Sequence, residues 1–251
     1  MAGSETNPSV LLEQIKKSIK SKQELEYFYI HQDRYKFVLE KILKLNLPKG
    51  SKVLDIGCFP PHIFHGLEVL GFEVWGIASK HEPVKLKNVV SLNIESDKIY
   101  LKESYFDLIL FSEVIEHLIV SPKIYLPKLK KLLKNEGQIF ITTPNGAHLK
   151  NRMKLLLGKS PSFGIGQLYQ TKLGDDSIYY RHNREFTGSE VKQIMKDNGF
   201  KIRNFEFFAA YSPFRKNLNR DPVTGIVKLV GYLITVMFPG LKDSQYILVA
   251  K

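Results

Sequence analysis

The sequence lacks the features that would direct it out of a reducing compartment or through a membrane. Its single cysteine, Cys58, leaves no internal disulfide to stabilise a secreted fold. Residues 1–22 have no apolar core before a small-residue cleavage site, so we expect no secretory signal. The longest apolar run, Leu229 to Phe238, is shorter than the roughly 20 residues that cross a bilayer. We therefore expect a cytoplasmic protein, with at most a peripheral membrane contact.

The sequence also lacks a basic block, although its formal net charge is +12. The 37 Lys and Arg residues are spread along all 251 positions, which favours a solvated basic surface. An acidic or phosphorylated substrate is the alternative that the charge leaves open. No aromatic RNA-binding signature accompanies the charge, so we expect no nucleic-acid partner.

Short apolar runs alternate with helical patterns along the chain. Strands are expected at residues 53–56, 72–78, 89–92, 106–111, 138–142, 200–208 and 246–249. Helices are expected over 63–70, over 121–134 and after Thr187, which forms a capping box with Glu190. This alternation favours an α/β fold with a doubly wound, mostly parallel seven-stranded sheet.

Three segments stand outside this alternation. Residues 9–47 have helical spacing and form an N-terminal helical extension, 1–48, before the main domain at 49–251. Two insertions, about 144–186 and 209–244, follow strands at the carboxyl side of the sheet, where α/β folds bind ligands. The first carries seven basic and three acidic residues, which favours an anionic acceptor. Within the second, residues 226–238 could face a membrane or a lipid tail, but we favour a helix buried against the sheet.

The segment over residues 53–80 has the outline of a cofactor-binding βαβ unit. Asp55 and Gly57 stand where loop amides and a helix N-terminus could hold a polar or anionic group. Phe59, Pro60 and Pro61 replace the flexible residues usual in such loops, and prolines offer no N–H donor. Alone, this segment is equally consistent with a tight turn in an α/β domain.

Longer segments carry a more specific pattern. VLDIGC at 53–58 and YFDLILFSEVIEHL at 105–118 closely resemble class I S-adenosylmethionine-dependent methyltransferases, which have a Rossmann-like fold. The chain is similar to the group that includes ubiquinone-type O-methyltransferases and enzymes encoded beside glycan-assembly genes. Residues 141–161, 181–200 and the ending LKDSQYILVAK resemble the second subgroup. The resemblance covers residues 50–251 and implies S-adenosylmethionine as the cofactor.

The resemblance also implies which positions bind the cofactor. The usual motif residues fall on Asp55, Gly57, Cys58, Ser79, Asn93, Ile94 and Ser112. The acidic residue that usually grips the ribose is replaced by Ala78, so Ser79 or Glu82 would have to take over part of its role. Losing one charged hydrogen bond there would weaken binding by about 1.5–3 kcal/mol.

Four residues are the candidates for catalysis and acceptor binding, namely Glu113, His117, His182 and Arg184. A short helix after the fourth strand would place Glu113 and His117 on one face, and His117 is favoured as the base because histidine titrates near neutral pH. A packing or capping role for His117 is equally open. His182 is a second candidate base, and Arg184 could bind an acidic acceptor or form a surface salt bridge.

The resemblance implies methyl transfer to an oxygen of a small-molecule, sugar or lipid-linked acceptor. A catalytically degenerate scaffold protein is the alternative, motivated by Pro61 and Ala78. A nucleic-acid methyltransferase is disfavoured, because Ser112-Glu113-Val114-Ile115 replaces the Asn/Asp-Pro-Pro-Tyr/Phe motif of enzymes that modify base amino groups. A homodimer stays open. We expect no metal site, because the seven histidines show no ligand spacing with cysteine or carboxylates.

Overall fold

One mixed sheet organises the computed structural model, which describes residues 7–80, 84–162, 164–170, 176–211 and 222–251. Within these residues seven strands lie in the order β3-β2-β1-β4-β5-β7-β6. They are β1 (Lys52–Ile56), β2 (Glu73–Ala78), β3 (Val89–Ser91), β4 (Phe106–Ser112), β5 (Leu133–Pro144), β6 (Lys201–Phe208) and β7 (Ser244–Ala250). Only β7 runs against its neighbours. The expected doubly wound, mostly parallel sheet is confirmed. Glu82 and parts of both expected insertions lie outside the described residues.

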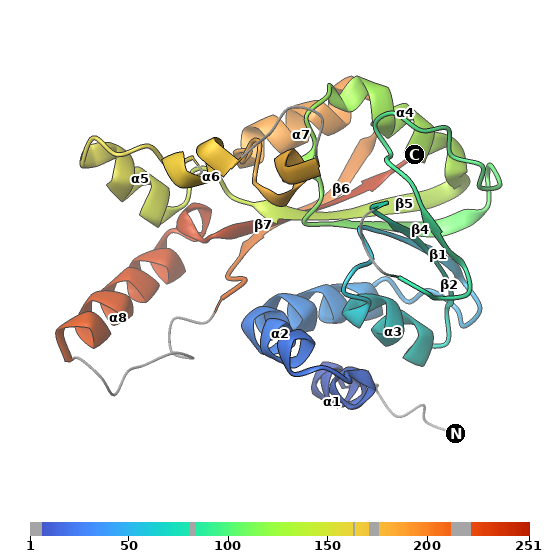
Figure 1. Ribbon diagram of the computed structural model, residues 1–251, viewed down its shortest axis with the longest axis horizontal. Coiled ribbons are helices and arrows are strands. Elements are labelled where there is room, and N and C mark those ends of the chain that lie inside the picture. The colour runs from blue at the N-terminus through green and yellow to red at the C-terminus, as the bar shows by residue number, and fades with distance from the viewer. Residues whose placement is uncertain (1–6, 81–83, 163, 171–175, 212–221) are drawn as a thin grey trace.

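Helices cover both faces of the sheet because alternate strand residues point to opposite sides. In β4, Leu108 and Leu110 pack against α1 (Pro8–Ser18), α2 (Lys22–Leu43) and α3 (His62–Val69). Ile109 and Phe111 pack against α4 (Pro122–Leu132) and α7 (Gly188–Asp197) on the other side. Figure 1 shows α4 and α7 above the sheet and α1 to α3 below it.

The N-terminal extension is helical and consists of two helices, with a break that the helical spacing over 9–47 did not indicate. The backbone becomes extended at Ile19 (ψ 127°), and Ser21 then caps α2 by accepting a 3.1 Å hydrogen bond from the Glu24 amide. The hairpin packs closely on α3: a Cβ at Gly66 would lie 2.9 Å from Ile15 Cδ1 and 3.2 Å from Leu39 Cδ2. The extension therefore shares its core with the strands of the main domain.

The remaining helices stand at the carboxyl edge of the parallel strands. They are η1 (Ile115–His117), α5 (Leu149–Leu156), α6 (Ile165–Gln170), η2 (Asp176–Tyr180), α8 (Pro222–Met237) and η3 (Pro239–Leu241). Because β6 runs in the same direction as β5, the segments that follow both strands leave from this edge. The Asn145 side-chain amide connects the start of the first segment to the end of the second. It donates to the Gly240 and Lys242 carbonyls at 2.9 and 2.8 Å.

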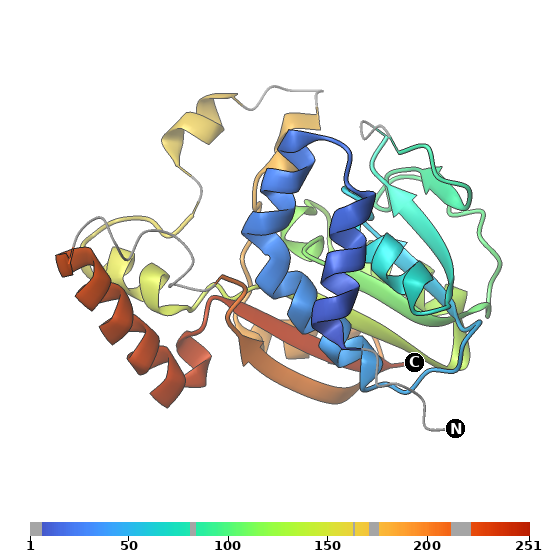
Figure 2. The same ribbon diagram turned by 90° about the horizontal axis from the view of Figure 1, so that it is seen from below.

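The helix α8 does not lie against the sheet, so the buried helix that we favoured for residues 226–238 is wrong. None of its described side chains is buried. In Figure 2 it stands apart from α1 and α2, beyond the end of the sheet. An apolar run fits a core helix and an exposed helix equally well, and here no layer extends far enough to cover it. Among the described residues, no helix combines the length and the apolar character that crossing a membrane requires.

Candidate active site

The loop after β1 turns tightly against β2. Gly57 has a positive φ of 76°, and its amide donates to the Ile77 carbonyl at 2.8 Å. A Cβ at Gly57 would lie 2.6 Å from Val114 Cγ2, so both the backbone conformation and the space demand glycine. Cys58 is buried beside the loop. At the start of α3, Pro61 supplies no capping side chain, which leaves the helix N-terminus without a side-chain acceptor.

Asp55 lies near the end of β1, directly before this loop. It is 4% exposed, and burial raises the pKa of its carboxyl to about 8. A carboxyl in this state is neutral at pH 7 and ionises readily when a cation is placed beside it. The end of β1 therefore offers a loop and a carboxyl that suit a ligand with both anionic and cationic groups.

The carboxyl ends of β2 and β3 form the next part of the edge. Ala78 and Ile94 are buried and apolar. The Asn93 side chain is already engaged: its Oδ1 accepts from the Glu95 amide at 2.9 Å, and its Nδ2 donates to the Tyr179 hydroxyl at 3.0 Å. Ser79 also has an interaction partner. Asn93 therefore joins this edge to the segment after β5, and a nucleoside bound there would meet Tyr179 as well.

At the ends of β4 and β5, a polar network joins the two strands. The Ser112 and Thr142 hydroxyls are 2.7 Å apart, and the Glu113 amide donates to the Thr142 carbonyl at 2.8 Å. Glu113 has a positive φ of 56°, which turns the chain sharply after β4. Its Oε2 lies 3.2 Å from Arg34 Nη1 of α2, and its Oε1 is buried without a hydrogen-bond partner.

Glu113 and His117 were expected on one helical face, but the structure differs. The short helix is a 3-10 turn that begins at Ile115, so Glu113 lies outside it. Glu113 faces Arg34, whereas His117 contacts the segment that precedes α7.

Glu116 lies between them and is fully buried. The Thr143 hydroxyl donates to its Oε2 at 2.9 Å, while its Oε1 has no hydrogen-bond partner and lies 3.9 Å from His117 Nε2. Burial raises the pKa of Glu116, and the nearby Glu113 carboxylate raises it further. A buried carboxyl with one unsatisfied oxygen in a cluster of titratable groups is characteristic of a functional site.

His117 is held in one tautomer by its surroundings. Its Nδ1 lies 3.1 Å from the Arg181 carbonyl, which can only accept, so Nδ1 carries the proton. The Asn183 amide donates to the His117 carbonyl at 2.7 Å and fixes the backbone. Burial lowers the pKa of His117, and the neighbouring His182 lowers it further. The ring is therefore neutral at pH 7, with a lone pair on Nε2, which is the state of a general base.

His182 lies beside His117, although 64 residues separate them. Their ring centroids are 4.9 Å apart, and the rings meet edge to face. Nδ1 of His182 donates to Glu185 Oε1 at 3.0 Å, and this hydrogen bond raises the pKa of His182. The two histidines thus have opposite tendencies, His117 toward the neutral base and His182 toward the cation.

One atom each from Glu116, His117 and His182 lies within 4.8 Å of the others, which is close enough to hold a cation. Histidine spacing along the sequence gave no sign of this group, because it draws on η1 and on the distant segment before α7.

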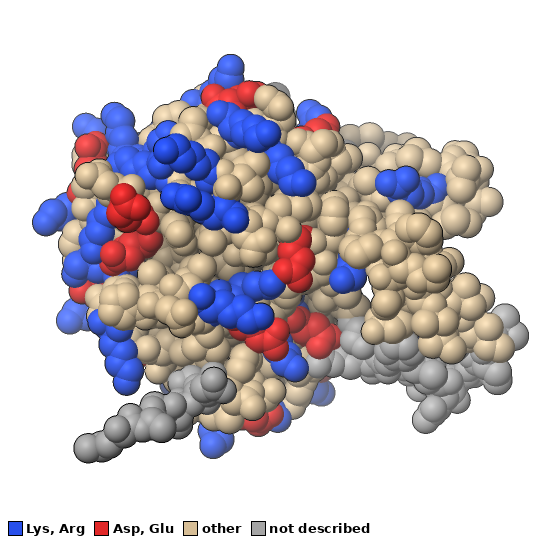
Figure 3. Space-filling model, turned by 180° about the vertical axis from the view of Figure 1, so that it is seen from behind, with Lys and Arg blue, Asp and Glu red and all other residues tan. Residues whose placement is uncertain are grey.

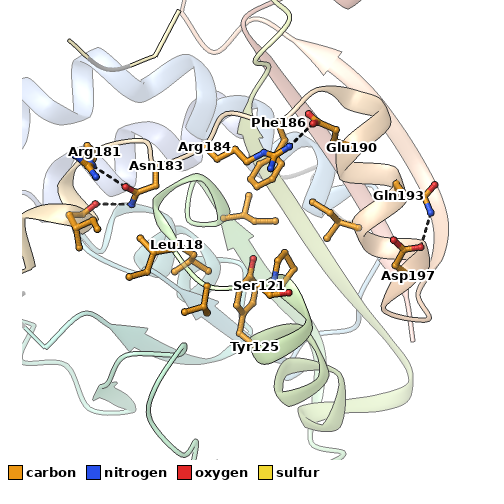
Figure 4. Close-up of a pocket in the computed structure, with 16 residues that line it drawn as sticks. Leu118, Ser121, Tyr125, Arg181, Asn183, Arg184, Phe186, Glu190, Gln193 and Asp197 are labelled. Carbon is orange, nitrogen blue, oxygen red and sulfur yellow. Dashed lines mark hydrogen bonds and ion pairs between the residues drawn. The ribbon is translucent and has the colours of Figure 1, made fainter. Parts of the chain in front are cut away.

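Arg184 faces a different part of the molecule. It donates to Glu190 Oε1 at 2.7 Å at the surface, and its guanidinium lies 5.3 Å from the centroid of the buried Phe186 ring. It borders a cavity of about 620 Å³ between α4 and α7 (Figure 4). None of the expected cofactor-binding residues, and neither of the candidate histidines, His117 and His182, lines this cavity. The surface salt bridge left open for Arg184 is what the structure contains.

Sequence reasoning missed several residues of the site. Arg34, Glu116, Thr143 and Asn183 were not singled out. Arg34 is a charged residue within the apolar stripe of α2, beside Tyr35 and Val38, and this signal could have marked it. Glu116 was visible as the second carboxylate of Glu113-Val114-Ile115-Glu116-His117. The partners Thr143 and Asn183 depend on contacts between distant segments, which no local pattern records.

Comparison with known proteins assigns the chain to a family. The family model described as a methyltransferase domain matches residues 29–204, which include most of α2 and all four catalytic candidates. The bovine mitochondrial ubiquinone biosynthesis O-methyltransferase is 26% identical over 180 residues, covering 66% of this chain and 45% of that protein. The enzyme of the same name from Bradyrhizobium diazoefficiens is 28% identical over 117 residues, covering 41% and 44%. The chain spans about half the length of the curated relatives it matches.

Solved structures share the fold at low identity. An S-adenosylmethionine-dependent methyltransferase from Archaeoglobus fulgidus superimposes with a TM-score of 0.55 at 18% identity, covering 90% of this chain and 99% of that one. The 1,6-didemethyltoxoflavin-N1-methyltransferase of Burkholderia thailandensis gives 0.54 at 12%, covering 100% and 92%. These likenesses concern the fold alone, and the family match adds the sequence evidence. The chain belongs to the class I S-adenosylmethionine-dependent methyltransferase family.

Proposed function

We propose that this chain is an active methyltransferase that moves a methyl group from S-adenosylmethionine to an oxygen of a small-molecule acceptor. The observation that carries the proposal is His117, a neutral histidine whose Nδ1 lies 3.1 Å from the Arg181 carbonyl and whose Nε2 lies 3.9 Å from Glu116 Oε1. With the proton on Nδ1, the lone pair of Nε2 can accept a proton. Methylating a hydroxyl requires a group that removes its proton, whereas a pure scaffold has no use for one.

The residues at the strand ends suit the cofactor. The Gly57 loop and the uncapped start of α3 would hold the carboxylate end, and Asp55 would face a cationic group. Asn93, Ile94 and Ser79 would border the nucleoside, with Ser112 below it at the end of β4. S-adenosylmethionine, when bound, supplies a methyl group activated by its sulfonium sulfur.

The protein's own contribution is position and proton transfer. His117 Nε2 accepts the proton of the acceptor hydroxyl as that oxygen becomes nucleophilic. His182, held by Glu185, favours its cationic form and would stabilise negative charge on the acceptor side. Glu113 and Arg34 fix the sharp turn after β4 that places η1 and His117 at the edge of the site.

The acceptor class rests on two observations. The curated relatives are named as O-methyltransferases of ubiquinone biosynthesis, a name that indicates a small-molecule acceptor. Residues 144–186, which follow β5, also carry seven Lys or Arg against three Asp or Glu, which favours an acceptor with an acidic group. A small phenol, a sugar or a lipid-linked form of either remains within the proposal.

The first test is calorimetric titration of the folded protein with S-adenosylmethionine and S-adenosylhomocysteine, followed by acceptor screening on prenylated phenols and glycans. We expect micromolar binding of both and a raised melting temperature, because a ligand of the folded state stabilises it. Methyl transfer to a phenol or sugar hydroxyl would support the proposal. No binding at millimolar cofactor, in protein that melts cooperatively, would leave the catalytically degenerate scaffold as the function.

Asp55 gives this titration a specific signature. Its carboxyl is neutral at pH 7 because burial raises its pKa to about 8, and a cationic group of the cofactor would favour the ionised form. Binding at pH 7 should therefore release a proton, and affinity should rise with pH until about 8. Titrations in buffers of different ionisation enthalpy measure the release. The Asp55→Asn variant should show none, and equal release from both proteins would assign the proton to another group.

We expect the transfer to proceed without a metal, despite the grouping of Glu116, His117 and His182. A cation there would have to ionise Glu116, whose burial favours the neutral form, and would occupy the base. Addition of a chelator should leave kcat unchanged. A loss of activity that Mg²⁺ or Zn²⁺ restores would contradict this expectation and place a cation in the group.

A further inference from the structure

The helix α8 has an apolar surface that the described part of the chain leaves exposed. Over residues 226–238 its large apolar side chains are mostly solvent-exposed, among them Val227 at 65%, Leu233 at 51% and Met237 at 73%. Ordinary surface helices hide such residues on one face, and contiguous exposed apolar patches mark interaction sites. Packing among the residues that the structure describes therefore does not explain the exposure.

A second exposed apolar segment belongs to the same end of the molecule. It spans α5 and α6, and its exposed members are Met153, Leu155, Leu156, Leu157, Ile165, Leu168 and Tyr169. Of the second segment, α5 approaches α8, where a Cβ on Gly231 would lie 3.9 Å from Leu149 Cδ2. We call α5 and α8 together the apolar wing.

The charge on the apolar wing has one sign. Residues 147–170 and 222–242 contain no Asp or Glu, but they include Lys150, Arg152, Lys154, Lys159, Lys228 and Lys242. In Figure 3 the body of the molecule is crowded with both blue and red side chains, whereas the projecting end is tan with scattered blue. Apolar area bordered by cations alone complements a surface that is apolar inside and anionic outside.

We propose that the apolar wing docks on the surface of an anionic lipid bilayer, with α8 lying in the interface. A helix of 16 residues spans roughly 24 Å, enough to lie along the bilayer surface and too short to cross it. The cations of α5 and α8 then face the phosphate headgroups. A second copy of this chain is the competing occupant, but it would bring the same cations against each other.

The proposal does not depend on catalysis and is tested by binding alone. The full chain is incubated with vesicles of phosphatidylcholine, with and without about one quarter phosphatidylglycerol, and bound protein is separated by flotation. We expect binding to the anionic vesicles, and weaker binding as salt is raised from about 0.05 to 0.5 M.

A matched pair of variants locates the contact. In V227D/V230D two exposed valines of α8 become carboxylates; in the control, V10D/V69D, valines of similar exposure change on α1 and α3. We expect the first pair to lower the partition coefficient by roughly tenfold or more and the control to leave it unchanged. All four positions are exposed, so melting temperatures should stay equal, and they are measured to confirm it.

Two outcomes would overturn the proposal. One is absence of vesicle binding by the unchanged protein at low salt. The other is a dimer in light scattering that V227D/V230D dissociates while vesicle binding stays unaltered, since the wing would then be covered by a second copy.

Discussion

Replacing His117 with glutamine is expected to lower kcat by about 10²–10⁴-fold while leaving the affinity for S-adenosylmethionine unchanged. Glutamine keeps a polar side chain of similar reach but cannot accept the proton of an acceptor hydroxyl. The protein holds His117 neutral and directs its Nδ1 to the Arg181 carbonyl, so the loss should fall on the chemical step.

The pH profile separates this role from a structural one. In the unchanged protein, kcat should fall on the acid side only below the ordinary histidine value of 6.5, because burial lowers the pKa of His117 and protonation blocks Nε2. The variant should lose this limb.

His65→Gln is the matched control, since His65 pairs with Glu68 on α3 away from η1. The variant His182→Gln should retain the limb and lower kcat less. If H117Q were no slower than the control, the base would have to be another residue.

The second large effect concerns stability. Arg34→Met is expected to lower the free energy of unfolding by about 3–5 kcal/mol, because it leaves the Glu113 carboxylate buried without its cation. The side chains of Arg34 and Glu113 are only 10% and 14% exposed, so water cannot replace the partner easily. Glu113 Oε1 already has no hydrogen-bond donor, and the buried Glu116 lies nearby.

Chemical denaturation of a double-mutant cycle measures the pair itself. R34M/E113Q should be more stable than the sum of the two single losses indicates, because neither charge is then left alone. Lys36→Met on the same helix is the control: its ion pair with Glu40 is exposed and should contribute less than about 0.5 kcal/mol. Equal losses for R34M and K36M would mean that solvent reaches Glu113.

The fold was largely predictable because its strands are short apolar runs separated by clear end signals. All seven expected strands are present, and the capping box of Thr187 and Glu190 starts α7 as expected. The break between α1 and α2 was missed, although Ser21 and Glu24 have the spacing of a helix start. Continuous helical periodicity on both sides concealed it.

The site was predictable only where it depends on strand ends. Motif positions such as Gly57, Asn93 and Ser112 do lie along one edge, because parallel strands end together. The proximity of His117 to His182 and the pairing of Arg34 with Glu113 require segments 65 and 79 residues apart to meet, which no local spacing encodes. The prediction that residues 226–238 form a buried helix was wrong for a related reason. Whether a helix is buried depends on which other segments pack against it, and the local sequence does not record this.

The direction of β6 has a consequence for how an acceptor could arrive. Since β6 runs with β4 and β5, the chain leaves it at the edge that also carries Ser112 and η1. A molecule resting on α8 would therefore present its reactive edge to the plane of the lipid headgroups. Acceptors dissolved in that plane would reach it by lateral diffusion, and their local concentration, rather than the bulk one, would set the rate. Measured KM values should then depend on the mole fraction of acceptor in the vesicle.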